Sequence, residues 1–300
     1  MLNIYDYITQ GNFFRKFEVN DLLFVEYKCM IEEARTGYWT HNNYFIYTLS
    51  GKRKWTTDNK EYVLEGGEAI FIKKGAYIVD QYTQDDFCAL LIFVPDDYIK
   101  SVLSLCSPEY FEAKNSPPEP CEHNSIIPLY LDESFSTYFH SVLSYFSKST
   151  PPPKGLLQLK FQELILNVLT NPKSQSLASY FYNIHESNKV CIRSIMETCF
   201  MHHMALEEYA KLCARSLSSF KADFQAIYKT SPGKWLMTKR LERAKFLIET
   251  TEEPVNDIAF RSGFKNTSHL VRLFKETYGR PPHQYRLIRS SDNLNPVFTL

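Results

Sequence analysis

The run LEEYAKLCARSLSSFKADFQAIYKTSP at residues 206–232 recurs, with substitutions, as VNDIAFRSGFKNTSHLVRLFKETYGRPP at residues 255–282. Tyr209-Ala210 corresponds to Ile258-Ala259 at an offset of 49 residues. Later positions correspond at an offset of 50: Phe220 with Leu270, Phe224 with Phe274, Tyr228 with Tyr278 and Pro232 with Pro282. The one-residue difference falls in the turn, where loop length varies most easily. The pattern therefore predicts two copies of one structural unit.

Each copy has the pattern of a helix-turn-helix. A short helix carries the apolar pair, and Gly263 supplies the positive φ that a tight turn requires. Ser216 and Asn266 are predicted caps that open a second helix in each copy. In that helix apolar residues share one face at i, i+4 and i+7, and the opposite face is polar. An isolated copy is most simply a structural helical hairpin, but two copies favour a pair of DNA-reading helices.

The polar face of each second helix holds the candidate base-contacting residues. A helix fits the major groove, where such side chains reach base edges. The candidates are Ser218, Lys221, Ala222 and Gln225 in the first copy and Thr267, Ser268, His269 and Arg272 in the second. Lys221 and Arg272 can pair with guanine edges or contact phosphate alone. The candidates for phosphate contacts, which position the protein without reading sequence, are Lys275, Arg280 and Arg286.

Residues 232–250 join the two copies and are predicted to be helical. Pro232 suits a helix start, and KWLMTKRLERAKFLIET has apolar residues at helical spacing. About 18 residues at 1.5 Å each span roughly 27 Å. That length can hold the two reading helices near the separation of one turn of DNA, roughly 34 Å. One chain is therefore expected to address two successive major-groove segments.

The run RLERAKFLIETTEEPVNDIAFRSGFKNTSHLVRLFKETYGRPPHQYR resembles the DNA-binding domain of AraC-type transcription regulators. The resemblance covers residues 189–287, and its motifs are Arg240…Ala244, Asp257-Ile258-Ala259…Gly263-Phe264 and Gly279-x-Pro281-Pro282-x-x-Tyr285-Arg286. It implies a sequence-specific regulator, and the eight candidate residues match the reading positions of that family. Lys229 departs from the pattern, because the first repeat of the family commonly has Gly there.

Charge is divided unequally along the chain, although the formal net charge is zero. Residues 189–290 contain 18 Lys and Arg against 10 Asp and Glu, a formal charge of +8, and residues 1–188 carry −7. A basic C-terminal module suits a polyanion such as double-stranded DNA. The seven cysteines are scattered without a CxxC motif, which is typical of a reducing cytoplasm. The sequence predicts no signal peptide and no membrane span.

Residues 22–94 alternate with a period of two, and turn residues recur at Gly51, Asp58-Asn59, Gly66-Gly67 and Gly75. Segments such as LLFVEYKCM, YFIYTLSG and FCALLIFV predict short strands of a barrel or sandwich. Their order resembles the cupin-like sensor half of AraC-type regulators. A shorter pattern is similar to the N-terminal domain of type III secretion activators in that family: Leu49-x-Gly51…Trp55…Tyr62-x-Leu64-x-x-Gly67…Phe71-x-x-Lys74-Gly75-x-Tyr77.

Residues 96–184 are predicted to be helical, with the candidate helices DDYIKSVLSLCS, DESFSTYFHSVLSYFSKS and LLQLKFQELILNVLT. Residues 116–128 contain four prolines and are expected to form a loop. The broad apolar faces of these helices need a partner surface, either the barrel or a second copy of the chain. The pattern does not separate packing from dimerisation, and a homodimer is expected. Residues 185–189 are expected to link the two halves.

Metal and catalytic sites have little support in the sequence. A cupin metal centre needs two or three His and a carboxylate, and His41 is the only His in residues 1–122. Cys199, His202, His203 and Cys213 resemble a ligand set, but packing in the first helix and turn of the DNA-binding domain is the simpler interpretation. Cys88 lies in an apolar strand, where burial blunts thiol reactivity. We therefore predict no cofactor, metal or catalytic residue.

These observations predict an α+β protein with a cupin-like β-barrel sensor at residues 1–95 and a helical segment at 96–184. An all-α DNA-binding domain with two helix-turn-helix units and a linker helix follows at 189–287, and residues 288–300 form a tail. The expected function is a sequence-specific transcription regulator, an activator, whose N-terminal domain senses a small ligand or a protein partner. The alternative is a cupin-fold metalloenzyme fused to a DNA-binding domain, which a tightly held metal would favour.

Overall fold

The computed structural model describes residues 1–28, 35–57, 60–82, 86–106, 125–186 and 191–292. The chain divides into two compact units, Met1–Val190 and Cys191–Leu300. Several predicted features lie wholly or partly outside the described residues: the turn at Asp58-Asn59, residues 116–124 of the loop, residues 187–189 of the linker and residues 293–300 of the tail.

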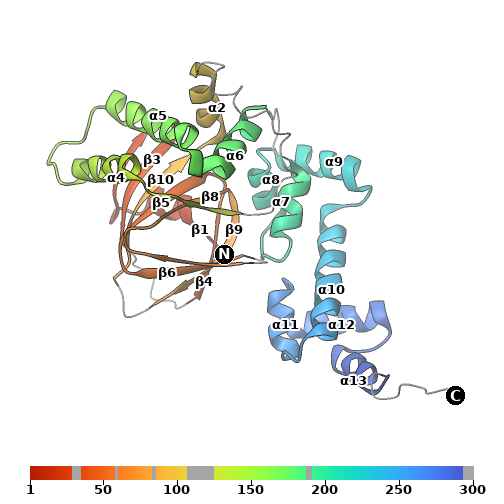
Figure 1. Cartoon of the computed structure of the whole chain (residues 1–300). Coiled ribbons are helices and arrows are strands. Elements are labelled where there is room, and N and C mark those ends of the chain that lie inside the picture. Colours follow the sequence, from red (N-terminus) through yellow and green to blue (C-terminus); the bar gives the residue numbers. More distant parts are fainter. Residues whose placement is uncertain (29–34, 58–59, 83–85, 107–124, 187–190, 293–300) are drawn as a thin grey trace. The chain divides into compact units, whose positions relative to one another are not determined.

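The first unit contains two β-sheets (Figure 1). The six-stranded sheet has the order β11-β8-β5-β10-β3-β2, with β2 Arg15–Val19, β3 Leu22–Lys28, β5 Asn43–Ser50, β8 Ala69–Ile72, β10 Cys88–Val94 and β11 Ile126–Leu129. The five-stranded sheet has the order β1-β4-β9-β6-β7, with β1 Leu2–Asn3, β4 Arg35–Thr40, β6 Lys52–Thr56, β7 Glu61–Glu65 and β9 Gly75–Gln81. The described strands thus form two facing sheets rather than one closed barrel.

Alternation along each strand explains how the six-stranded sheet is buried on both faces. In β5, Tyr44 and Ile46 enter the core shared with the five-stranded sheet, whereas Phe45 and Tyr47 enter the core on the other side. Successive side chains of a strand point to opposite faces, so a continuous apolar strand must be covered twice. The run CALLIFV of β10 follows the same rule and lies between β5 and β3.

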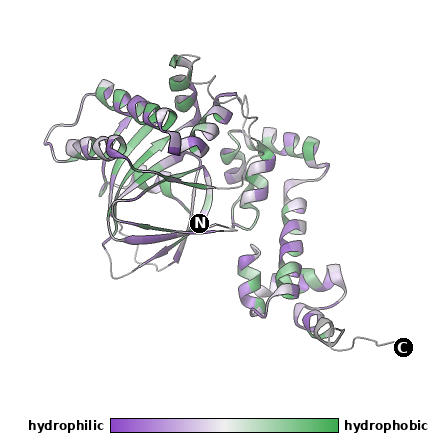
Figure 2. Cartoon of the chain, viewed as in Figure 1, coloured by the Kyte–Doolittle hydropathy of each residue, from purple (hydrophilic) through white to green (hydrophobic). Residues whose placement is uncertain are grey.

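Four helices cover the second face of the six-stranded sheet: α2 Asp96–Leu105, α4 Glu133–Phe146, α5 Lys154–Thr170 and α6 Gln175–Glu186. They contribute large buried side chains, including Phe135, Phe139, Phe161 and Phe181, each at 0% exposure. Full burial of one such side chain stabilises the fold by about 1.5–3 kcal/mol. Hydrophobic and hydrophilic residues alternate along these helices (Figure 2), as expected for helices with one apolar and one polar face. Packing against the sheet is therefore what covers their main apolar faces.

Some elements of the first unit differ from the sequence-based expectation. The lead at residues 1–20 forms β1, helix α1 (Ile4–Gln10) and β2. Residues 126–128 of the predicted loop belong to β11, which pairs with β8 at the edge of the sheet formed by the described strands. Proline is tolerated on an edge strand, because the amide that it lacks need not pair with a neighbouring strand. The 3₁₀ turn η1 (Pro172–Ser174) follows α5 and leads into α6. Helix α6 was not singled out from the sequence pattern, and it extends to Glu186.

The second unit is entirely helical in its described part: α7 Ile192–Cys199, α8 Leu206–Leu212, α9 Leu217–Tyr228, α10 Pro232–Thr250, α11 Val255–Arg261, α12 Thr267–Tyr278 and α13 Pro282–Asp292. Helix α10 has 19 residues and is roughly 28 Å long. It contacts α9 and also α11, α12 and α13. The predicted class, sheets followed by helices and then an all-α region with two helix-turn-helix units, is confirmed.

Candidate nucleic-acid interface

The two helix-turn-helix units share their turn geometry down to the hydrogen bonds. The Arg215 amide donates to the Ala210 carbonyl at 3.0 Å, and the Phe264 amide donates to the Ala259 carbonyl at 2.9 Å. Both pairs keep the offset of 49 residues. The reading helices then start at Leu217 and Thr267, an offset of 50, so the additional residue of the second turn is Lys265.

Both reading helices are fixed at their first turn by the predicted caps. The Ser216 hydroxyl accepts from the Ser219 amide, and the Asn266 side chain accepts from the His269 amide at 2.8 Å. Such caps satisfy amides that have no partner inside the helix and contribute about 1 kcal/mol each. Each reading helix has 12 residues.

The inner face of each reading helix packs into its own aromatic cluster. Phe224 stacks on Tyr228 with ring centres 4.5 Å apart, and Trp235 of α10 packs edge-on against Phe224 at 5.9 Å. The second helix-turn-helix repeats this arrangement with Phe274, Tyr278 and Tyr285 of α13. Trp235 and Tyr285 are again 50 residues apart, so α10 and α13 begin as equivalent helices and the repeat includes a third helix.

The outer face of α9 presents the first set of predicted base-contacting residues. All four, Ser218, Lys221, Ala222 and Gln225, are exposed. The Ser218 hydroxyl lies 3.1 Å from the Ser216 hydroxyl. Asp223, on the same helix, is paired with Arg215 at 2.8 Å, which partly neutralises the only carboxylate of this helix.

The outer face of α12 is divided between exposed and half-buried side chains. Ser268 and Arg272 are exposed, and Arg272 pairs with Glu276 at 3.2 Å. An ion pair on the surface is worth little, so DNA can replace it. Thr267 and His269 are half-buried: Thr267 donates to Asn256 at 2.6 Å, and His269 lies edge-on to Phe264.

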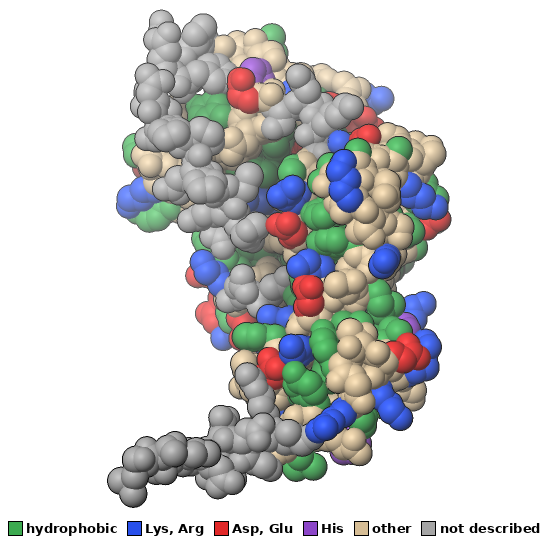
Figure 3. Space-filling model, turned by 90° about the vertical axis from the view of Figure 1, so that its right-hand side faces the viewer, with side chains coloured by type: hydrophobic (Ala, Val, Ile, Leu, Met, Phe, Trp, Pro, Cys, Tyr) green, Lys and Arg blue, Asp and Glu red, His purple; other side chains and the backbone are tan. Residues whose placement is uncertain are grey.

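The three predicted phosphate contacts have different surroundings. Lys275 and Arg280 are exposed. Arg286 is half-buried, and its guanidinium donates to the carbonyls of Ile248 and Glu253 at 3.4 and 2.8 Å. These carbonyls lie at and just beyond the end of α10, so Arg286 ties α13 to the linker helix. On the face that Figure 3 presents, Lys and Arg side chains are scattered among acidic, hydrophobic and other side chains.

Arg240 of α10 has a role that sequence reasoning did not find, although it belongs to the quoted family motif. Its Nε donates to the Phe200 carbonyl at 2.7 Å, and an Nη donates to the His202 carbonyl at 2.8 Å. Both carbonyls belong to the turn between α7 and α8. An Arg inside a helix gives no sequence signal for such contacts, because they join residues about 40 positions apart.

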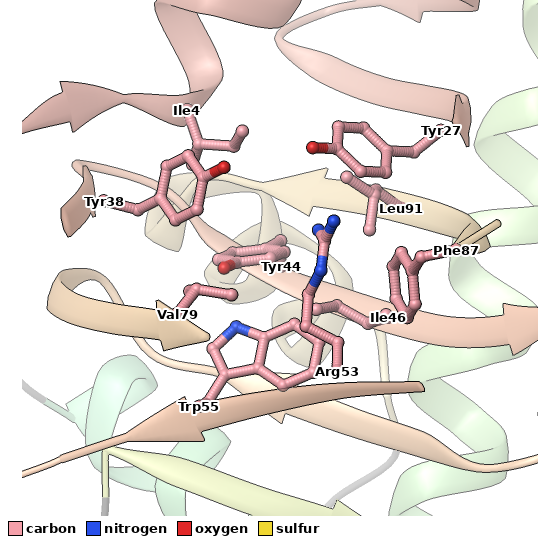
Figure 4. Close-up of a pocket in the computed structure, with 10 residues that line it drawn as sticks. All are labelled: Ile4, Tyr27, Tyr38, Tyr44, Ile46, Arg53, Trp55, Val79, Phe87 and Leu91. Carbon is pink, nitrogen blue, oxygen red and sulfur yellow. The ribbon is translucent and has the colours of Figure 1, made fainter. Parts of the chain in front are cut away.

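A small cavity lies between the two sheets of the first unit (Figure 4). Its volume is about 20 Å³, which is room for about one water molecule. Arg53 and Trp55, both of β6, project into it, and the Arg53 guanidinium lies 4.2 Å from the centre of the Phe87 ring. The other lining residues are aromatic or aliphatic: Ile4, Tyr27, Tyr38, Tyr44, Ile46, Val79 and Leu91. Burial raises the pKa of Tyr44, which therefore stays neutral.

Within the described ranges, no three His, Cys, Asp or Glu side chains are grouped closely enough to hold a metal ion. Cys199 and Cys213 are buried, and burial lowers the pKa of the His202 imidazole to about 4. The described part of the chain also contains no helix that is long and apolar enough to span a bilayer.

The fold and its paired exposed helix faces define a DNA-binding protein with two helix-turn-helix units. Residues 43–180 match the model of the ExsA N-terminal regulatory domain, and residues 209–287 match that of a helix-turn-helix domain. The chain is thus an AraC-type transcription regulator with an ExsA-type N-terminal domain, as the sequence predicted.

Known proteins with similar sequences are regulators. The virulence regulon transcriptional activator VirF of Yersinia enterocolitica is 24% identical over 243 residues, which cover 80% of this chain and 88% of VirF. The regulator ExsA of Pseudomonas aeruginosa is 22% identical over 229 residues, covering 75% and 79%. Among solved structures, ToxT of Vibrio cholerae matches with 12% identity and a TM-score of 0.39, covering 89% of this chain and 98% of ToxT.

Proposed function

We propose that the chain activates transcription by reading two successive major-groove segments of a promoter with α9 and α12. The observation that carries the proposal is the duplication: two equivalent capped helices, each with one buried face and one exposed polar face, on one α-helical unit. Activation rather than repression is supported by the name of VirF, a transcriptional activator. The proposed reading unit comprises residues 189–287.

Within that unit, the base-contacting residues proposed for α9 are Ser218, Lys221, Ala222 and Gln225, and those for α12 are Thr267, Ser268, His269 and Arg272. Arg has two donors suited to guanine, and Ser and Thr hydroxyls contact bases or phosphates. Lys275 and Arg280 contact phosphate in this proposal. Arg286 acts indirectly, because its guanidinium is already bound to carbonyls near the end of α10.

The N-terminal residues 1–95 and 96–184 receive the signal in this proposal. The cavity between the sheets favours a protein partner over a small molecule, because a small molecule would have to displace several lining side chains. Metal or substrate chemistry plays no part, and the protein acts in the cytoplasm, where promoter DNA is accessible.

We also propose a homodimer that forms through the outer face of α5. Leu156, Leu159 and Leu166 are 36%, 61% and 38% exposed, although the inner face of the same helix is buried. With Glu163 and Thr170, which are also exposed, they follow the alternating spacing of three and four residues that two packed helices use. This stripe is on the opposite side of α5 from the face that packs on the sheet, so a second copy of the chain can bind it.

Selection of bound fragments from a random DNA pool tests the reading function. We expect two short blocks of base preference separated by about one helical turn. Affinity for the selected duplex should fall steeply with salt, by about 10³-fold between 50 and 200 mM if six phosphates are contacted. Recovery of no preferred sequence, or an affinity that salt does not change, would contradict the proposal.

A further inference from the structure

Arg240 lies where α10, the α7–α8 turn and both helix-turn-helix units meet. It extends from α10, donates to the carbonyls of Phe200 and His202, and interacts with Tyr209 of the first helix-turn-helix. Tyr209 itself donates to the Cys199 carbonyl at 2.8 Å. Carbonyls at and just beyond a helix end lack partners inside the helix, and the Arg240 and Tyr209 donors supply partners for those of Cys199, Phe200 and His202. We call the site formed by Arg240 and residues 199–203 the joint.

The turn of the second helix-turn-helix packs closely against the joint. A Cβ added to Gly263 would lie 2.7 Å from the Met201 carbonyl oxygen and 2.9 Å from Arg240 Nε. Real Cβ atoms do not approach backbone oxygens so closely, so only glycine permits this contact. Gly279 offers a direct comparison, because its φ of +79° is close to the +85° of Gly263 but no atom of the described residues lies within 4 Å of its added Cβ.

Two histidines at the joint are compatible with the half-buried guanidinium of Arg240. Burial lowers the pKa of His202 to about 4, and burial also lowers the pKa of His203. Both imidazoles are therefore neutral at pH 7, and neither repels Arg240. His203 also forms a hydrogen bond with the backbone of Phe264, next to Gly263. This bond is another link between the α7–α8 turn and the second helix-turn-helix.

The joint adds a second structural connection between the two reading helices, α9 and α12. Through α10 alone, the second helix-turn-helix would be attached at one end of a helix, and long helices are rarely straight. Contact with both α10 and the α7–α8 turn restrains the second helix-turn-helix at two points. We propose that Arg240 is a positioning residue that fixes the spacing and phase of α12 relative to α9 on the duplex. This inference depends on the DNA-reading function proposed above.

The test measures spacing preference in the full-length chain. The duplex selected by the wild-type chain is altered by inserting or deleting one base pair between its two preferred blocks. We expect the wild-type chain to bind each altered duplex at least tenfold more weakly. Arg240→Gln should bind the original duplex more weakly, and its preference over the altered duplexes should shrink to within about threefold. Arg240→Lys keeps the charge but loses the planar guanidinium that donates from two separate nitrogens, so it should show the same loss in milder form.

Matched controls separate positioning from charge and from backbone strain. Lys239→Ala removes one positive charge from a residue that pairs with Glu242, and it should leave the spacing preference intact. Gly263→Ala should reduce the preference, whereas Gly279→Ala, with similar backbone strain but open space, should retain it. Thermal unfolding of each variant identifies loss of fold, and Arg240→Lys provides the comparison if Arg240→Gln does not fold.

Each outcome has a distinct meaning. A folded Arg240→Gln or Arg240→Lys variant that keeps the tenfold spacing preference would overturn the positioning role and leave the DNA-reading function standing. If the wild-type chain selects no pair of blocks, the reading function itself fails.

Discussion

Lys229 and Gly279 end the two reading helices in the same left-handed backbone conformation, with φ of +56° and +79°. In both cases the amide donates to the carbonyl four residues earlier, Gln225 and Lys275 respectively. A left-handed residue with a side chain costs roughly 1–2 kcal/mol, and glycine avoids that cost. The duplicated geometry is therefore kept at Lys229 in spite of its side chain.

Replacing Lys229 by Gly should stabilise the second unit by about 1 kcal/mol, because relief of backbone strain exceeds the additional entropy of the unfolded chain. The midpoint of thermal unfolding should rise by a few degrees. The reverse change, Gly279→Lys, should destabilise the unit by a similar amount. A lower unfolding temperature for Lys229→Gly would refute the strain argument.

Arg272→Ala should weaken binding to the selected duplex by about 1–3 kcal/mol and binding to random DNA by much less, if Arg272 reads a base. Titration of both duplexes with fluorescence anisotropy measures the two losses. Lys275→Ala is the comparison: as a phosphate contact it should weaken both duplexes about equally and make the salt dependence shallower. Equal losses for Arg272→Ala would reassign Arg272 to phosphate.

Leu159→Glu should convert a dimer into a monomer, because it places a charge in the middle of the α5 stripe. Light scattering coupled to size exclusion measures the mass at several concentrations. Leu105→Glu is a suitable control, since Leu105 is 77% exposed on α2, outside the stripe. An unchanged mass for Leu159→Glu would exclude the stripe as the dimer surface.

Asn43→Ala should destabilise the first unit by about 2–4 kcal/mol. The fully buried Asn43 amide donates to Asp96 at 2.7 Å, and its oxygen accepts from the Lys74 amide at 3.0 Å and from the Tyr180 hydroxyl at 2.9 Å. Removing this side chain takes a hydrogen-bond partner from three half-buried residues, Asp96, Lys74 and Tyr180, and leaves a cavity at a fully buried position. Tyr180→Phe removes one of these bonds and should cost only about 1 kcal/mol. Urea unfolding distinguishes the two, and equal losses would contradict this account.

Acid should destabilise the second unit through His202. Burial holds its pKa in the folded state at about 4, below the 6.5 of an exposed imidazole. Between these pH values the unfolded state binds more protons than the folded state. The free energy of unfolding is therefore highest above pH 6.5, and it falls by up to about 3 kcal/mol as the pH drops toward 4. His202→Gln should flatten this dependence in thermal unfolding, whereas exposed His283→Gln should not. Parallel curves for wild type and His202→Gln would disprove it.

The duplicated unit was predictable because its signals are local. Caps at Ser216 and Asn266, glycine at Gly263 and apolar spacing within a dozen residues determine each helix-turn-helix. The exposure of the α9 candidates followed from the same spacing. The two half-buried α12 candidates did not, because the contacts of Thr267 with Asn256 and of His269 with Phe264 cross between helices.

Elements that depend on distant partners escaped the sequence reading. Strand β4, Arg35–Thr40, is defined by its pairing with β9 and β1. Strand β11 exists because β8 offers an edge, although Pro128 favours a loop. Two facing sheets and a closed barrel produce the same alternation, so the pattern predicted strands but not closure.

The opposite charges of the two halves have a practical consequence for handling the protein. With a sequence isoelectric point near 7.1, copies in neutral buffer have little net repulsion, and the basic region of one copy attracts the acidic region of another. Salt screens that attraction. Salt also weakens the binding of DNA to the protein. Solubility and promoter affinity should thus respond to ionic strength in opposite directions.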